Sequence, residues 1–151
     1  MKNFIENATS LDLSEILRID REVVGDQIDR AEEINLAVQT SECRIIVSNS
    51  VIVAFAITAR ESYKRMDFLK LLVVHPAHRR LGHATSLLFD FQLNATTPFC
   101  WTSTNRSNSE MIRLLRKLEW ADSGYKEELD VDDPDLFFSY DRKRGPLSLE
   151  E

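Results

Sequence analysis

Two hydrophobic patterns alternate along the chain. In one, β-branched and other apolar residues follow one another in short runs, which is typical of strands. In the other, apolar residues recur every three or four positions, which is typical of amphipathic helices. The first pattern predicts strands at residues 3–8, 43–48, 51–59, 67–74, 98–104, 125–129 and 136–140.

The second pattern predicts helices between these strands. They are expected after Ser10 or Asp12, from Asp29 to Gln39, after Gly82, and after a Ser-x-x-Glu capping box at Ser107 and Glu110. The helix after Gly82 carries the clearest apolar stripe, at Ala84, Leu87, Leu88, Phe91 and Ala95. A stripe of this kind is buried against a sheet.

Two of the strand segments have informative surroundings. The runs at 43–48 and 51–59 are separated by Asn49 and Ser50, a turn-forming pair that predicts an antiparallel hairpin. The run at 67–74 is apolar on both faces, as expected of a central strand covered by helices on both sides. Lys70 interrupts this run; its ammonium group either lines a groove or reaches solvent, and the second is the commoner case.

Composition narrows the class of protein. The 151 residues suffice for one domain, expected at 1–144 with a tail at 145–151, and 43% hydrophobic residues exclude a disordered chain. The net charge of −6 argues against a protein that coats nucleic acid. The longest apolar run, 51–57, is too short to cross a membrane, and no secretory signal is recognised, so a cytoplasmic protein is expected. Two cysteines, Cys43 and Cys100, support neither a disulfide framework nor a cysteine-rich zinc site.

The stretch "HPAHRRLGHATSLL", residues 75–88, joins a strand to a helix. The first N–H groups of a helix have no partner within the helix, and the helix dipole adds partial positive charge there. A phosphate fits this position, and Arg79 and Arg80 can add charged hydrogen bonds. Gly82 and Ala84 let a pyrophosphate approach the backbone. The stretch lacks the Lys-Ser/Thr of a P-loop and the three glycines of a dinucleotide fingerprint.

On these residues the chain resembles the GNAT superfamily of acetyl-CoA-dependent N-acetyltransferases. Its "LLVVHPAHRRLGHATSLL" matches the family's motif A at Val74, Pro76, Arg79, Gly82 and Ala84. A second segment, "NSEMIRLLRKLEW", is similar to the family's "N-x-x-A-x-x-L-Y-x-K-x-G-F" pattern at Asn108, Met111, Leu114, Lys117 and Trp120. Together with the order of the elements, the resemblance covers nearly the whole chain.

The resemblance implies an α/β (α+β) fold. Its central sheet is mixed and mostly antiparallel, with about six to seven strands, about four flanking helices and a splayed strand pair that holds the cofactor. It also implies acetyl-CoA as co-substrate, without a metal. The cofactor-binding residues it implies are Leu72, Val73, Val74, Arg79, Arg80, Leu81, Gly82, His83, Ala84, Thr85 and Asn108.

The implied reaction is direct attack of an acceptor amine on the thioester. A lysine-like amine has a pKa near 10.4, so a group must take its proton. Glu61 and Asp67, at facing ends of adjacent strands, are the candidate bases, although carboxylates at strand ends are usually only solvated. The family's tyrosine acid is replaced by Leu115 and the glycine of its Gly-Phe pair by Glu119. Tyr125 or Tyr140 could supply the acid, although such tyrosines more often pack.

Two further features carry alternatives. His75, His78 and His83 lack the spacing of a metal site and are expected in the loop and at the helix start. The acidic run 127–135 is either a solvated loop or a surface that attracts a cationic acceptor.

The expected function is therefore acetyl transfer to a small-molecule or peptidic amine carrying positive charge. The alternative is a catalytically silent acyl-CoA-binding or regulatory module. No nucleic acid or membrane partner is expected, and the sequence leaves open whether the protein is a homodimer.

Overall fold

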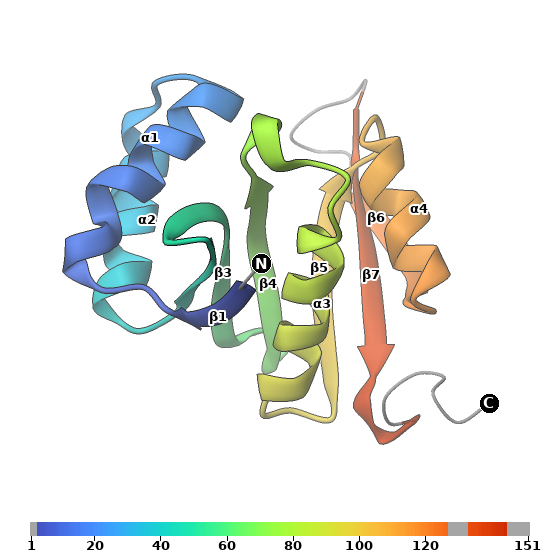
Figure 1. Ribbon diagram of the computed structural model, residues 1–151. Coiled ribbons are helices and arrows are strands. Elements are labelled where there is room, and N and C mark those ends of the chain that lie inside the picture. Colours follow the sequence, from blue (N-terminus) through green and yellow to red (C-terminus); the bar gives the residue numbers. More distant parts are fainter. Residues whose placement is uncertain (1–2, 127–132, 145–151) are drawn as a thin grey trace. The chain divides into compact units, whose positions relative to one another are not determined.

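The computed structural model describes residues 3–126 and 133–144 of the chain (Figure 1). The strands are β1 (Asn3–Asn7), β2 (Cys43–Ser48), β3 (Val51–Tyr63), β4 (Met66–Val74), β5 (Phe99–Asn105), β6 (Ala121–Lys126) and β7 (Asp135–Asp141). The α-helices are α1 (Leu13–Val24), α2 (Ile28–Gln39), α3 (His83–Asn94) and α4 (Ser109–Lys117). Among the described helices, none is long and apolar enough to cross a membrane.

The seven strands form one sheet in the order β1-β2-β3-β4-β5-β7-β6. Pairing is antiparallel between β1 and β2, β2 and β3, β5 and β7, and β6 and β7. The pairing of β4 with β5 is parallel and joins Asp67–Leu69 to Cys100–Thr102. The predicted fold class, a mixed and mostly antiparallel sheet with four helices, is confirmed.

The chain divides into two compact units. Unit 1 comprises residues 1–58 and 70–93, and unit 2 comprises residues 59–69 and 94–151. Strands β3 and β4 therefore contribute one part to each unit.

Unit 1 has a hydrophobic core supplied by α1, α2 and the strands. Its fully buried side chains include Ile16 and Ile19 from α1, Ile34 from α2 and Phe55 from β3. Apolar residues recur every three to four positions in these helices, so they lie on one helix face, as the sequence predicts. Arg44 of β2 also binds Asp90 of α3 with two hydrogen bonds, at 2.9 and 2.8 Å, and so attaches this helix to the same unit.

The start of α1 differs from the expectation of a cap at Ser10 or Asp12. Thr9 is the capping residue of a 3-10 turn, Ser10–Asp12, that leads into the helix. The Thr9 side chain accepts from Leu11 N, and the Asp12 carboxylate accepts from Thr9 N at 2.9 Å. Asp12 is the residue before α1, as expected, but its side chain makes no cap hydrogen bond to that helix and instead takes the acidic position of a capping box centred on Thr9.

Two tight turns set the strand pairs β2–β3 and β3–β4. Asn49 and Ser50 have φ values of 51° and 70°, and Lys64 and Arg65 have φ values of 52° and 63°. Two consecutive positive φ values are the signature of a type I′ hairpin turn. The predicted hairpin at Asn49 and Ser50 is confirmed, while β3 extends beyond the expected end at residue 59 to Tyr63.

Unit 2 is built from β5, β7, β6 and α4. Leu115 of α4 is wholly buried, and Leu118 and Trp120 are nearly so. Trp120 lies 5.6 Å from the ring of Tyr140 on β7. The apolar face of α4 that carries Leu115 is therefore buried in the core of this unit.

The expected capping box at Ser107 and Glu110 is wrong by one residue. Asn108 is the N-cap of α4, and its side chain accepts from Met111 N at 3.3 Å. Ser107 is engaged elsewhere, because its N–H and hydroxyl both donate to Asp133, at 2.8 and 2.7 Å.

The helix α4 ends in a Schellman motif. Trp120 N donates to Leu115 O and Glu119 N to Arg116 O, at 2.9 and 3.0 Å. Glu119 occupies the left-handed position of this motif with φ 67°. The geometry explains why glycine is common at the equivalent position of the family's pattern.

Candidate functional site

The main chain at the end of β4 has one side facing β3 and one facing away. His75 N donates to Val53 O of β3 at 2.9 Å. Main-chain groups alternate in direction along a strand, so those of Val73 also face β3. The N–H and C=O groups of Leu72 and Val74 consequently point to the side of β4 away from β3. An extended ligand arm could bind these groups as an added strand does.

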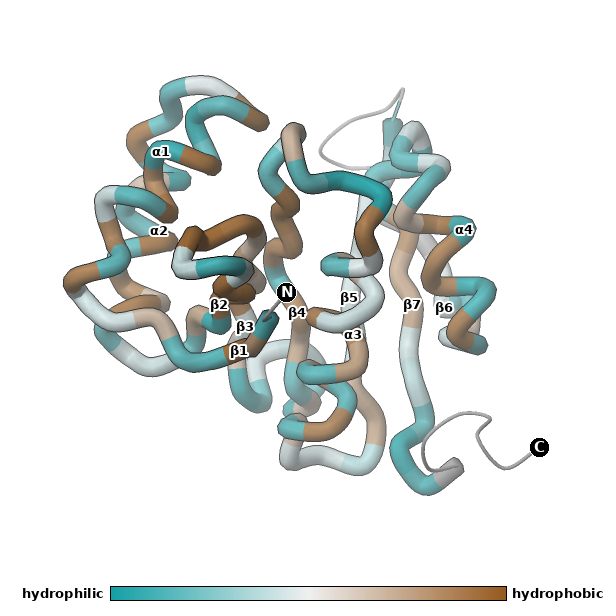
Figure 2. The backbone as a smooth tube through the Cα atoms, viewed as in Figure 1, coloured by the Kyte–Doolittle hydropathy of each residue, from teal (hydrophilic) through white to brown (hydrophobic). Residues whose placement is uncertain are grey.

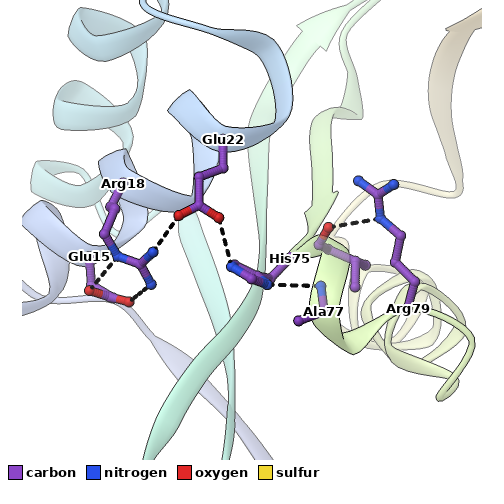
Figure 3. A network of polar contacts seen from close by, with 7 residues as sticks. Glu15, Arg18, Glu22, His75, Ala77 and Arg79 are labelled. Atoms are coloured by element: carbon purple, nitrogen blue, oxygen red, sulfur yellow. Dashed lines mark hydrogen bonds and ion pairs between the residues drawn. The ribbon is translucent and has the colours of Figure 1, made fainter.

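The turn after β4 is held by its own side chains. A short 3-10 helix, Pro76–His78, follows the strand, and His75 caps it by accepting from Ala77 N at Nδ1, at 3.0 Å. The Nε of Arg79 donates back to Val74 O at 3.2 Å, so this guanidinium lies beside the end of β4 (Figure 3). In Figure 2 this loop is hydrophilic, in contrast to the strand before it.

Two residues of the turn have left-handed backbone conformations. Arg80 has φ 66° and Gly82 has φ 86°. A β-carbon built on Gly82 would meet no heavy atom within 4 Å, so the space beside this residue is open. Glycine is favoured here by its backbone conformation, and the open space suits the close approach of a ligand.

The helix α3 starts directly after Gly82 and completes an anion-binding arrangement. Its first intrahelical hydrogen bond runs from Ser86 N to Gly82 O at 3.0 Å. By helix geometry the N–H groups of His83, Ala84 and Thr85 have no acceptor within the helix. With the helix dipole and the exposed Arg79 and Arg80, this junction suits a phosphate or pyrophosphate.

His83 lies at this junction as a neutral side chain at pH 7. It is only 5% exposed. Burial lowers the pKa of His83, and electrostatic repulsion from the nearby His78 ring adds a smaller effect in the same direction. An anion at this junction would therefore meet arginines and main-chain N–H groups rather than an imidazolium at residue 83.

A polar network joins α1 to the turn after β4 (Figure 3). Glu22 Oε1 lies 2.9 Å from His75 Nε2. The other oxygen of Glu22 accepts from Arg18 at 2.6 Å, and Arg18 also binds Glu15. No local sequence pattern indicates this network, because the pairing of residue 22 with residue 75 depends on how the strand and the helix pack.

The two candidate bases lie close together but differ in their surroundings. Asp67 is 3% exposed and accepts from Glu61 N at 2.9 Å, from Thr96 N at 2.7 Å and from Thr96 Oγ1 at 3.2 Å. Its own N–H donates to Thr97 Oγ1. Glu61 is exposed, with φ 49°. Asp67 is thus a structural tie between the start of β4 and the segment before β5, whereas the Glu61 side chain is open to solvent.

The candidate acids are less accessible. Tyr140 is 4% exposed, lies opposite Cys100 in the β5–β7 pairing and contacts Trp120. Tyr125 is in β6, and its side chain is outside the described part of the chain. Leu115 faces the core of unit 2 and is wholly buried.

Other predicted features have ordinary structural roles. Lys70 forms an ion pair with Glu33 of α2 at 3.0 Å, with 41% of its side chain exposed. Asn108 caps α4, as described above. No group of His, Cys, Asp and Glu suited to a metal is found among residues 3–126 and 133–144. Most of the acidic run lies outside the described residues, but Asp133 holds Ser107 and Asp135 accepts from Asn105 Nδ2 at 3.3 Å.

Neither cysteine is suited to nucleophilic chemistry. Cys43 and Cys100 are free and buried. Burial raises the pKa of each thiol to about 12. Both are therefore thiols, not thiolates, at physiological pH.

The chain is similar in structure to solved acetyltransferases. A GNAT-family acetyltransferase from Bacillus cereus is 29% identical and has a TM-score of 0.87, with 93% of this chain and 98% of that one covered. Two others share the fold at lower identity. The diaminobutyrate acetyltransferase EctA of Paenibacillus lautus, in complex with L-2,4-diaminobutyric acid and coenzyme A, is 19% identical, with a TM-score of 0.72 and 91% and 94% of the two chains covered. The protein yncA of Salmonella typhimurium, with its cofactor acetyl-CoA, is 18% identical, with a TM-score of 0.74 and coverage of 93% and 94%. No family model matches the sequence, and no curated protein matches it.

Proposed function

The protein belongs to the GNAT superfamily and is an acyltransferase, and from this membership we propose that it transfers the acetyl group of acetyl-CoA to a cationic primary amine. The observation that carries the proposal is the junction of β4 and α3. There, a left-handed Gly82 with open space beside it leads into a helix N-terminus flanked by two exposed arginines.

Each part of the junction has a role toward acetyl-CoA. The main-chain groups of Leu72 and Val74 face away from β3 and would hold the pantetheine arm, with Val73 between them. The residues that would hold the pyrophosphate follow the strand: Arg79, Arg80, Leu81, Gly82, His83, Ala84 and Thr85. Asn108, from the family's second motif, is proposed as a further contact besides capping α4. The cofactor supplies the thioester, and a main-chain N–H beside it would polarise the carbonyl.

Calorimetric titration of acetyl-CoA into glycine variants tests this site. Gly82→Val places a side chain in the open space, and we expect it to abolish binding. Gly25, at the end of α1, has the same φ of 86°, with ψ 179°, and is equally open, so Gly25→Val is a control for placing valine at a positive φ. A valine forced into a backbone conformation of this kind costs about 1–3 kcal/mol of stability. Equal affinity of the two variants for acetyl-CoA would overturn the proposed site.

The acceptor side of the proposal rests on charge and exposure. An amine with a pKa near 10.4 is protonated at pH 7, and making it neutral costs roughly 4.6 kcal/mol. Of the candidate bases, Glu61 is proposed, since it is exposed whereas both oxygens of Asp67 are engaged. The net charge of −6 favours a cationic acceptor, small or peptidic.

Kinetics test the acceptor side. With a cationic amine, kcat/KM falls as ionic strength rises. Glu61→Gln lowers kcat and moves the rate profile to higher pH, where the amine no longer needs the base. Salt-independent turnover of a neutral amine, with Glu61→Gln equal to the parent, would contradict both points.

One observation favours the alternative of a silent acyl-CoA-binding module. Leu115 stands where the family has a tyrosine, and it is wholly buried without a proton to donate. A thiolate with a pKa of about 8.5 is nevertheless an adequate leaving group, so the loss of this acid does not by itself exclude transfer. The two functions differ in whether an amine causes release of coenzyme A.

A further inference from the structure

Four aromatic side chains cluster on the strands of unit 2. Tyr63 ends β3, and its ring lies 5.1 Å from that of Trp101 on β5 at 63°. Phe137 of β7 stacks against Tyr63 at 5.3 Å and 21°, and Phe68 of β4 lies 5.5 Å from it. Tyr63 and Trp101 thus form two walls of a corner, and the phenylalanines support the Tyr63 wall.

An ammonium group occupies this corner. Lys64 Nζ lies 5.4 Å from the centroid of Tyr63 and 5.2 Å from that of Trp101. Both distances are within the range in which a cation is attracted by the face of an aromatic ring. Lys64 is exposed and belongs to the two-residue turn between β3 and β4.

The aromatic residues of this cluster also remain partly accessible to solvent. Tyr63, Phe68, Trp101 and Phe137 are all only partly buried. Aromatic rings that are fully buried in a core offer no surface to a ligand. The rings of this cluster instead present a partly exposed surface next to the ammonium group of Lys64. The negative net charge of the chain adds to the attraction for a positive ligand.

We propose that this corner, formed by Tyr63 and Trp101, is a binding site for an organic ammonium ion, with a methylated ammonium group as the preferred ligand. A methylated cation fits ring faces because it needs no hydrogen-bond acceptors and loses less hydration than the ammonium of lysine. Lys64 is the resident cation of the free protein, and a ligand displaces it. The proposal goes beyond acetyl transfer and does not depend on it.

Choline is a suitable probe, and its neutral isostere 3,3-dimethyl-1-butanol is the control for shape and apolar contact. Binding is followed by the indole N–H signals in NMR spectra at constant ionic strength and without acetyl-CoA. Trp101 reports the corner. Trp120 is 3% exposed, packs on Tyr140 and serves as the internal control.

We expect choline to shift the Trp101 signal in a saturable way and to leave Trp120 unchanged, while the isostere has no effect at the same concentration. Lys64→Ala removes the competing cation and should tighten choline binding about two- to fivefold. Tyr63→Leu should abolish it, with the Trp120 signal showing that the unit is folded.

Several outcomes would overturn the proposal. The first is an equal shift of the Trp101 signal with choline and with the isostere, and the second is no shift with either. The third is weaker binding of choline by the Lys64→Ala variant than by the parent protein. The protein could also prove to be a dimer that choline does not dissociate but that the Tyr63→Leu substitution does. The aromatic surface would then be an interface between two copies of the chain and not a ligand site. The comparison of choline with its isostere uses the unmodified protein, so it decides the question even where Tyr63→Leu does not fold.

Discussion

The carboxylate of Glu22 lies 2.9 Å from Nε2 of His75, and this contact joins the last turn of α1 to the residue that follows β4. The Nδ1 of His75 accepts a hydrogen bond from Ala77 N, so the proton of the neutral ring is at Nε2, facing Glu22. With both ring nitrogens engaged, His75 has no lone pair to act as a base. Its role is to hold the turn that starts the proposed cofactor site.

Substitution of His75 separates its two contacts. His75→Ala loses both hydrogen bonds and should reduce the free energy of unfolding by about 1–2 kcal/mol, measured by urea denaturation. An asparagine can still accept from the N–H two residues ahead, so His75→Asn should recover roughly half of this loss. If both variants were as stable as the parent, the network would have no role in stability.

Substitution of Asp67 should reduce stability far more than substitution of Glu61. Asp67→Ala leaves the N–H groups of Glu61 and Thr96 without their buried acceptor and should cost about 2–4 kcal/mol in chemical denaturation. The exposed Glu61→Gln should change stability by less than about 0.5 kcal/mol. An Asp67→Ala variant as stable as the parent would show that the carboxylate does not tie these segments together.

The hydrophobic pattern predicted most of the fold because burial drives it. The β-branched runs became strands and the spaced apolar residues became buried helix faces, as Ile16 and Leu115 illustrate. The helix caps were harder to predict, since Thr9, Ser10 and Asp12 all favour capping and only the local geometry selects Thr9. At α4, the preference of Ser107 was overridden by its bonds to Asp133, which lies far along the chain.

Arg80 has a backbone conformation that favours glycine, with φ 66°. Arg80→Gly should therefore raise the free energy of unfolding by about 0.5–1 kcal/mol. The same change removes a positive charge and should weaken acetyl-CoA binding, more at low salt than at high salt. Thermal unfolding and calorimetry measure the two effects.

Ser50→Gly is the matched control for Arg80→Gly. Ser50 has φ 70° in the Asn49–Ser50 turn, so glycine should stabilise the protein there without changing affinity for acetyl-CoA. Arg80→Gly with undiminished affinity at low salt would remove Arg80 from the proposed site.

His83 should make stability depend on pH. Burial lowers its pKa in the folded protein, so the unfolded chain takes up a proton first as pH falls below about 6.5. Stability contributed by neutral His83 is present above that pH, declines as pH falls, and levels off below the lowered pKa. In denaturation from pH 7 to 5, His83→Gln should lose less stability than the parent. Parallel curves would contradict this assignment.

The candidate site was predictable only where it is continuous in sequence. Residues 72–85 are recognisable as a candidate site from the order of strand, turn, Gly82 and helix, because each of these features has its own local sequence signal. The Glu22–His75 contact and the aromatic corner around Lys64 join residues distant in sequence, so no local pattern indicated them. The burial of Asp67 was likewise not predictable, since a carboxylate at a strand end is usually solvated.

Acetyl transfer by this protein can be tested through amine-dependent release of coenzyme A. The protein is incubated with acetyl-CoA and, separately, with polyamines, amino acids, aminoglycosides and lysine peptides, and the free thiol and the mass of each amine are measured. We expect thiol release with at least one cationic amine, matched by an amine heavier by one acetyl group and absent with Gly82→Val. Binding of acetyl-CoA without thiol release or acetylated product across the panel would contradict acetyl transfer. The remaining function would then be that of a catalytically silent acyl-CoA-binding module.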